Sequence, residues 1–450
     1  MSQSNFTNPI RDHLRRPKSS GVIIAVVIVS FLTILARATI SGAKTEMAHD
    51  LHINDVEFGV VFGAFALGYA VFMLPCGLLA DRWGPRKSLA LSVFFWSVFT
   101  LLTGVVSGIS ILVTIRFLFG LAEAGVYPQA TRAILNWVRP QALGLALGLL
   151  NLGSRLGAAF GLALTPLMIS AVGWRQSFVW LGIVGTAWSA VWFFWFRDRP
   201  PVETEGKSRT IPTTSRMPRN FWKSFVKSRN VYLILYQYFA SQFTFFICLS
   251  WLLPYLRSRY HIPPQEAGVL ASLPLCAGVL SMWIGGTSVD YLYRTTSIRN
   301  SRTLPAMIGF GLAAGVMLVA PHIPTAPLFI ACFAVIAFGV DLTISSSWTV
   351  CCDVGGDFAG TLSAAMNTFG ALGSLASSLL FPASIARYGT IKPYFILASL
   401  FNAVAILCWR LIDPNVRILA SEKDTSSSSS PVEQLKPDVA FLTHQEKSYR

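Results

Sequence analysis

The feature that most constrains this chain is a series of apolar blocks, each long enough to cross a lipid bilayer. A membrane-spanning helix needs roughly 20 predominantly apolar residues, and such blocks recur from residues 21–40 onward to a last one that ends near Ile412. Hydrophobic residues make up 53% of the 450 residues, whereas charged residues make up only 13%. Since a soluble fold does not need repeated apolar blocks of this length, the pattern predicts an all-α membrane protein.

The hydropathy pattern predicts about twelve transmembrane helices in two halves of six. A stretch rich in charged residues, Pro, Ser and Thr separates the halves and lacks a continuous apolar surface. The first block is too long for a signal peptide and lacks a small-residue cleavage site, so we take it as the first span. The predicted order is a cytoplasmic N-terminal segment (1–20), a six-helix bundle (21–196), a cytoplasmic linker (197–229), a second six-helix bundle (230–412) and a disordered cytoplasmic tail (413–450).

The net charge of +15 could indicate nucleic-acid binding, but the positions of the basic residues decide otherwise. They gather in alternate connections between the apolar blocks, which is the distribution that the positive-inside rule produces. We therefore expect a multi-pass protein of the cell inner (plasma) membrane with both termini in the cytoplasm, and no nucleic-acid partner. The seven cysteines have no metal-ligand spacing, so we expect neither a metal nor a cofactor.

A specific motif joins the second and third blocks, where residues 77–87 read Gly-Leu-Leu-Ala-Asp-Arg-Trp-Gly-Pro-Arg-Lys. A weaker copy follows the eighth block at residues 285–290. The motif resembles the signature loop of the major facilitator superfamily, and two copies imply a duplicated fold with its substrate site between the halves near the bilayer midplane. Its glycines permit close packing and a tight turn. The resemblance assigns a conformational, gating role to Gly77, Asp81, Arg82, Gly84, Arg86 and Asp290.

Further motifs extend the resemblance over nearly the whole chain. They are residues 116–128 in the fourth span, Trp137, residues 173–175 and 196–200, and Trp348, Asp353, Gly360, Met366 and Asn367 in the second half. Together they resemble the anion:cation symporter family, which includes permeases for hexuronate, galactonate, glucarate, tartrate and phthalate. This resemblance implies a secondary active transporter that takes up a small organic anion, such as a sugar acid or dicarboxylate, with a proton as co-substrate.

Four ionisable residues inside the first-half spans are candidates for function, because each costs about 2.5 to 3.5 kcal/mol to insert. The resemblance assigns Arg37 to the substrate carboxylate, which a planar guanidinium can hold by two parallel hydrogen bonds. The alternatives for Arg37 are a structural pair with Glu123 or a side chain that snorkels to the interface. Glu123 is the candidate proton-coupling residue, and Arg116, two helical turns before it, is its candidate partner. The alternative is a permanent ion pair between these two.

Arg155 is an additional cation in the middle of the fifth span, and we expect it to contact substrate. Related permeases commonly carry an acid just before the first-span arginine, where this chain has Ala36. Glu123 must then carry coupling without help. Three arginines against one glutamate would make the cavity net cationic, which favours an anionic substrate, including one with two carboxylates.

Uncharged residues complete the predicted substrate site. Tyr69 matches a family tyrosine that can donate a hydrogen bond to the anion, while Gln237, Trp348 and Asn367 suit the hydroxyl groups of a sugar acid. Hydrogen bonding between helices is the alternative for the two amides. Asp341 lies inside the tenth span without a family counterpart. It is either a second proton site or the partner of a neighbouring residue.

Two other functions remain open at this point. An exchanger of organic phosphates or inorganic phosphate would also use paired arginines, and a membrane sensor could retain the transporter fold without transport. An enzyme is disfavoured, because the chain has no nucleophile and base constellation and no phosphate-cradling loop. We expect a monomer in the lipid bilayer that acts on a small anionic substrate.

Overall fold

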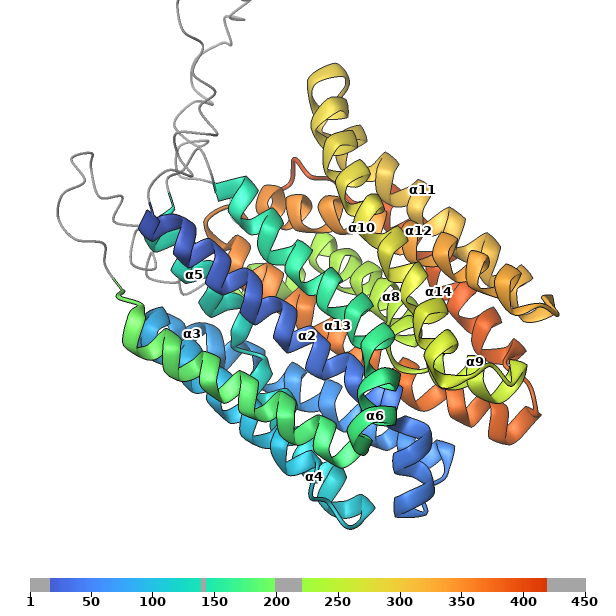
Figure 1. Ribbon diagram of the computed structural model, residues 1–450. Helices are drawn as coiled ribbons and strands as arrows, with labels where there is room; N and C mark the ends of the chain where they lie inside the picture. Colours follow the sequence, from blue (N-terminus) through green and yellow to red (C-terminus); the bar gives the residue numbers. More distant parts are fainter. Residues whose placement is uncertain (1–16, 139–142, 199–220, 419–450) are drawn as a thin grey trace, which may run out of the picture.

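The computed structural model describes residues 17–138, 143–198 and 221–418, and the regular structure of these ranges is helical (Figure 1). For residues 17–18, 74, 77–82, 143–145 and 357 only the backbone is described. The first half contains α2 (Pro17–Leu51), α3 (Asp55–Thr103), α4 (Ile109–Glu123), α5 (Val126–Trp137) and α6 (Leu143–Trp195). The second half contains α7 (Phe221–Lys227), α8 (Arg229–Ser250), α9 (Leu252–Tyr260), α10 (Pro264–Thr295), α11 (Ile298–Val319), α12 (Ala326–Gly355), α13 (Ala359–Tyr388) and α14 (Lys392–Leu411), with short 3-10 turns at Ala320–His322 and Gly356–Phe358.

Two of these elements are longer than one membrane crossing and reverse at a glycine. Gly84 divides the 49-residue α3 with φ 74°, and Gly173 divides the 53-residue α6 with φ 78°. Both angles lie in the left-handed region, which glycine adopts without a steric penalty. Figure 1 shows α6 turning back on itself at such a break. Each element is therefore a pair of antiparallel helices joined by a tight turn.

The expected all-α membrane fold is confirmed. Ten of the described helical stretches are long and apolar enough to cross a membrane. One of them, Ala146–Trp195, contains the turn at Gly173 and so crosses twice, and the part of α3 beyond Gly84 is a further apolar helix that lies outside the ten. The described residues thus contain the twelve crossings that the hydropathy pattern predicts.

Contacts between the two halves gather at one end of the bundle, which we call the closed end. It comprises the end of α2, the start of α3, the end of α8 and the short α9. Ser41 Oγ donates to the carbonyl of Ser250 at 2.7 Å, and the rings of Phe62 and Trp251 lie 5.3 Å apart. Arg257 Nη1 pairs with Glu46 Oε1 at 2.9 Å. These contacts tie α2 and α3 of the first half to α8 and α9 of the second.

Candidate functional site

Arg37 and Glu123 form an ion pair inside the first half. Arg37, on α2, donates from Nε to Glu123 Oε1 at 3.0 Å, and its Nη2 contacts the same oxygen. The Glu123 side chain, at the last residue of α4, is 0% exposed, whereas that of Arg37 keeps 18% of its surface. The other carboxylate oxygen, Oε2, has no hydrogen-bond partner among the described residues. We call this the first-half pair. A structural pair with Glu123 is one of the two alternatives to substrate contact that the sequence analysis gives for Arg37.

Aromatic rings from α3 and a tyrosine from α5 surround this pair. The Arg37 guanidinium lies 4.7 Å from the ring centroid of Phe65 and 5.2 Å from that of Tyr69. A cation over an aromatic face is attracted by the negative face of the ring. The Tyr127 hydroxyl lies 3.3 Å from Ser30 Oγ and within electrostatic range of Arg37. Tyr69, predicted from the resemblance, is therefore directly beside Arg37.

Arg116 has different surroundings from those expected. Its side chain is buried, and its guanidinium lies 4.4 Å from the ring centroid of Phe119 and 5.5 Å from that of Phe65. Within the part of the chain that the structure describes, the Nε of Arg116 has no hydrogen-bond partner. Glu123 forms its ion pair with Arg37 of another helix and not with Arg116. Arg116 shares a helix face with Glu123, but it interacts with that carboxylate only through longer-range electrostatics, and its guanidinium stacks on the two rings.

Arg155 and Asp341 form a second buried ion pair, which crosses between the halves. Arg155 Nη2, on α6, lies 2.5 Å from Asp341 Oδ1 on α12, and the exposed fractions of the two side chains are 12% and 0%. The guanidinium also lies 4.3 Å from the ring centroid of Phe245 on α8, and its Nε lies 3.5 Å from Met282 Sδ on α10. We call this the cross-half pair.

The cross-half pair changes the charge count of the site. Asp341, whose role the sequence left open, pairs with a neighbouring arginine, so the three arginines face two carboxylates instead of one. Each acid in the middle of a span is costly unless it is paired. The cost of an unpaired charge could have suggested that Asp341 of the tenth span pairs with Arg155 of the fifth. The spacing of the two residues in the sequence does not itself indicate that they meet.

The other uncharged candidates lie on the second-half helices. Gln237, on α8, is fully buried; its amide nitrogen donates to the carbonyl of Ile234 at 3.1 Å, and its oxygen accepts from Ser347 Oγ at 3.1 Å. It therefore links α8 to α12. Asn367, on α13, donates to the Ser363 carbonyl of its own helix at 3.1 Å. The Trp348 side chain, on α12, is 43% exposed.

Comparison with known protein families agrees with this architecture. We use the term charged centre for the first-half pair and the cross-half pair together. The sequence profile of the Major Facilitator Superfamily matches residues 26–378. The chain belongs to the major facilitator superfamily. It is therefore a transporter and not an enzyme, as predicted.

Two curated relatives and one solved structure show how far the likeness extends. A probable sulfoacetate transporter of Cupriavidus necator is 29% identical over 417 residues, which cover 89% of this chain and 95% of the relative. A probable L-galactonate transporter of Escherichia coli is 25% identical over 343 residues, covering 74% and 76%. A bacterial homologue of the human lysosomal transporter Spinster, in an inward-facing and unoccupied conformation, shares the fold with a TM-score of 0.74 at 16% identity, covering 88% of this chain and 97% of that one. The resemblance to the organic-anion permeases of the superfamily is confirmed.

The signature loop of this facilitator is described in part. For Gly77, Asp81 and Arg82 the structure describes the backbone alone. Gly84 forms the turn within α3, and the backbone N–H of Arg86 donates to Asp198 Oδ1 at 2.8 Å. In the second copy, Asp290 is exposed near the end of α10. The gating role of the loop stays a prediction.

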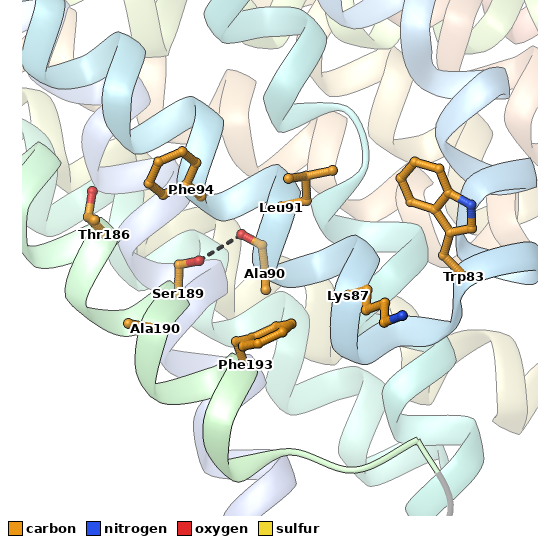
Figure 2. A pocket seen from close by; sticks show the side chains of 9 residues that line it. All are labelled: Trp83, Lys87, Ala90, Leu91, Phe94, Thr186, Ser189, Ala190 and Phe193. Atoms are coloured by element: carbon orange, nitrogen blue, oxygen red, sulfur yellow. Dashed lines mark hydrogen bonds between the residues drawn. The ribbon is translucent and has the colours of Figure 1, made fainter.

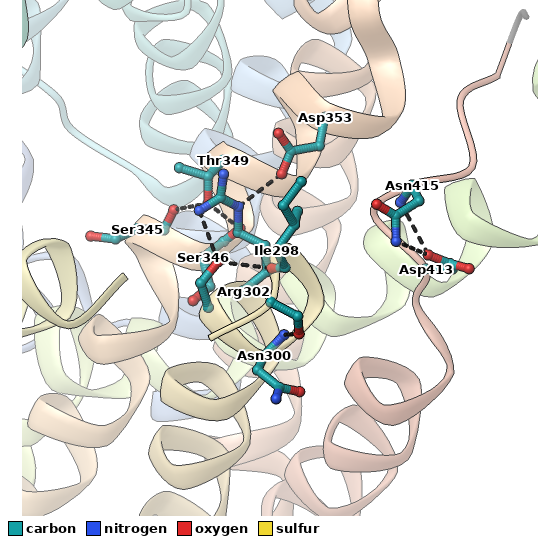
Figure 3. A network of polar contacts seen from close by, with 11 residues as sticks. Ile298, Asn300, Arg302, Ser345, Ser346, Thr349, Asp353, Asp413 and Asn415 are labelled. Atoms are coloured by element: carbon teal, nitrogen blue, oxygen red, sulfur yellow. Dashed lines mark hydrogen bonds and ion pairs between the residues drawn. The ribbon is translucent and has the colours of Figure 1, made fainter. Parts of the chain in front are cut away.

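Two other features of this facilitator lie away from both ion pairs. A hollow of about 760 Å³ opens between α3 and α6, where Trp83, Lys87 and Phe94 face Thr186 and Phe193 (Figure 2). None of the predicted site residues whose side chains the structure describes lines this hollow. In the second half, Arg302 of α11 donates from Nε to Asp353 Oδ2 of α12 at 2.8 Å (Figure 3). This ion pair joins two helices of the same half.

Proposed function

We propose that this facilitator takes up a small organic anion, a sugar acid or a dicarboxylate, together with a proton, by alternating access across the inner membrane. The observation that carries the proposal is the position of Arg37 at the centre of the first half. Its side chain is still partly exposed, lies on two aromatic rings and has a carboxylate partner that a substrate anion can replace. The likeness to a probable sulfoacetate transporter and a probable L-galactonate transporter supports this class of substrate.

The contacts of Arg37 suit a carboxylate better than a neutral solute. A guanidinium can offer two parallel N–H groups to one carboxylate. The neighbouring Tyr69 can donate a third hydrogen bond through its hydroxyl. The rings of Phe65 and Tyr69 fix the guanidinium in position, so that less rotamer freedom is lost when the anion binds.

Glu123 supplies a route for proton coupling in this proposal. When a substrate anion takes Arg37, the buried Glu123 carboxylate loses its ion-pair partner. A buried charge without a partner is costly, and binding one proton removes that charge. Uptake of one anion at Arg37 would therefore bring one proton onto Glu123.

The closed end supports alternating access. Its contacts, from Ser41 to Ser250, Phe62 to Trp251 and Glu46 to Arg257, join the two halves directly. In the proposed cycle these contacts break as the halves rock about the charged centre. With the termini in the cytoplasm, the closed end is the external gate.

Uptake into proteoliposomes tests the proposal. Purified full-length protein would be reconstituted with an inward proton gradient, and uptake of L-galactonate, sulfoacetate and D-glucarate would be measured. Phosphate and glycerol 3-phosphate would serve as competitors. Saturable uptake that the sugar acids inhibit and the phosphates do not is the expected result. Stronger inhibition by phosphate compounds would favour the phosphate exchanger instead, and binding without flux in sealed vesicles would favour the sensor.

A further inference from the structure

Asp341 lies at a position in the second half that corresponds to that of Glu123 in the first. Glu123 closes the 15-residue α4, the fourth span. Asp341 lies at nearly the same distance from the start of α12, the tenth span, which begins at Ala326. Both side chains are fully buried, and each has one oxygen paired with an arginine and a second oxygen to which no described residue donates a hydrogen bond. The two halves thus each hold one buried carboxylate against a guanidinium.

The surroundings of Arg155 show that its charge belongs to the interface between the halves. Arg155 is part of the first half, but Phe245, Met282 and Asp341, which its guanidinium contacts, are on three different helices of the second half. A movement of the halves that opens the interface at Arg155 would separate its guanidinium from these partners. Since a buried guanidinium without an anion is strongly unfavourable, Arg155 can leave Asp341 only when another anion replaces it.

We propose that Asp341 is a built-in stand-in for a substrate anion at Arg155. An anionic group of the substrate replaces Asp341 there, and the exchange loosens the tie between the halves at the moment when substrate is bound. This proposal rests on the proposed function and adds a second anion subsite to it. A substrate with two anionic groups would then bind Arg37 with one group and Arg155 with the other.

The space around Asp341 fits such an exchange. Its unpartnered oxygen, Oδ2, faces Gly278 of α10, where an added Cβ would collide with the carboxylate. The missing side chain at Gly278 is thus what lets Asp341 reach Arg155. Tyr69 of the first half lies within electrostatic range of Tyr238 of the second, and Tyr238 lies within the same range of Arg155. These tyrosines place the cross-half pair in the same charged region as Arg37.

The test compares the binding of dianions and monoanions by calorimetry on the purified full chain. In Asp341→Asn, which keeps the side-chain shape, Arg155 loses its competitor. We expect the Kd of D-glucarate and of sulfoacetate to fall about tenfold, within the range of typical coupling between sites. The Kd of L-galactonate, which has a single carboxylate, should change less than about threefold. The turnover rate should fall, because the variant has no carboxylate at position 341 to pair with Arg155 again when the substrate anion leaves.

Two further variants separate this role from a merely structural one. Asp341→Asn combined with Arg155→Gln should lose the gain in dianion affinity. Glu46→Gln, which removes the other ion pair between the halves, should leave the ratio of dianion to monoanion affinity as in the wild type. Gly278→Ala, which pushes the Asp341 carboxylate aside, should raise dianion affinity in the same direction as Asp341→Asn.

Each outcome of these measurements decides between the two proposals. Wild-type protein that binds none of the three anions overturns the proposed function and the stand-in role with it. Wild-type binding with an unchanged or weaker dianion affinity in both Asp341→Asn and Gly278→Ala overturns the stand-in role alone. An equal gain in affinity for dianions and for L-galactonate in Asp341→Asn would also overturn the stand-in role. So would the same gain in dianion affinity in Glu46→Gln. Either result would mean that the cross-half pair only holds the halves together.

Discussion

The two buried ion pairs of this transporter have the same chemistry but different mechanical settings. The first-half pair joins α2 to α4, which belong to the same six-helix half. The cross-half pair joins α6 to α12, which belong to different halves. Breaking the first pair changes the charge of a site, whereas breaking the second also removes a link between the two bodies that are proposed to move.

The difference shows how one type of interaction can serve binding in one place and conformational change in another. Arg37 lies against rings of its own half, so it can keep its position while its anion is exchanged. Arg155 lies against three helices of the other half, so its position depends on how the halves are arranged. In the proposed cycle, the contacts that hold Arg37 in place therefore do not change when the halves rock. The contacts that hold Arg155 do change, so anion binding at Arg155 is coupled to the movement.

The largest effect should come from removing the guanidinium of the first-half pair. Arg37→Ala leaves both the substrate anion and the buried Glu123 without their cation. Truncating one member of a buried, hydrogen-bonded charge pair costs about 2 to 5 kcal/mol, so uptake should fall by at least about 30-fold. Initial uptake rates in proteoliposomes measure this. Arg259→Ala, at an arginine near the end of α9, is the matched control, and normal transport by Arg37→Ala would remove Arg37 from the site.

Neutralising the carboxylate of the same pair should separate coupling from movement. Glu123→Gln keeps the side-chain shape but cannot exchange a proton, so accumulation driven by a proton gradient should disappear. Exchange of external for internal anion needs no net proton transfer and should continue. The two activities are measured side by side in the same vesicle preparation. Accumulation against a gradient at the wild-type level would assign coupling to another residue.

Charge reversal should distinguish the two pairs by stability. Arg155→Asp alone buries two facing carboxylates, and we expect a loss of about 3 to 5 kcal/mol in stability, seen as a lower melting temperature. Adding Asp341→Arg restores opposite charges across the halves and should recover most of that loss. The corresponding double reversal, Arg37→Glu with Glu123→Arg, should recover stability but not uptake. Its guanidinium is then carried by α4 and no longer projects from α2 beside Phe65 and Tyr69. A cross-half double variant as unstable as the single one would contradict the comparison.

The fold was largely predictable from the sequence, because each crossing leaves its own apolar block. The turn at Gly84 could also be anticipated, since it lies in a motif with closely spaced glycines and a proline. The charged centre was predictable only as a set of residues. Helix periodicity places Arg116 and Glu123 on one face, but it cannot show that Arg37 of another helix takes the carboxylate. The pairing of Arg155 with Asp341, 186 residues apart in the chain, depends on how the halves pack and has no local signal.

The smallest effect should come from the ion pair at the closed end. Glu46 and Arg257 also join the halves, but their side chains keep 29% and 16% of their surface. Both partners keep contact with solvent, whereas Glu123 and Asp341 of the other two pairs are fully buried. An ion pair whose two partners water can reach is worth about 0.2 to 1 kcal/mol, so Glu46→Gln should change initial uptake rates by at most about fivefold. Arg257→Gln should behave in the same way, because either substitution removes the same pair. A loss as large as that of the cross-half variants would mean that any link between the halves limits transport, and that burial of Arg155 and Asp341 has no special part in it.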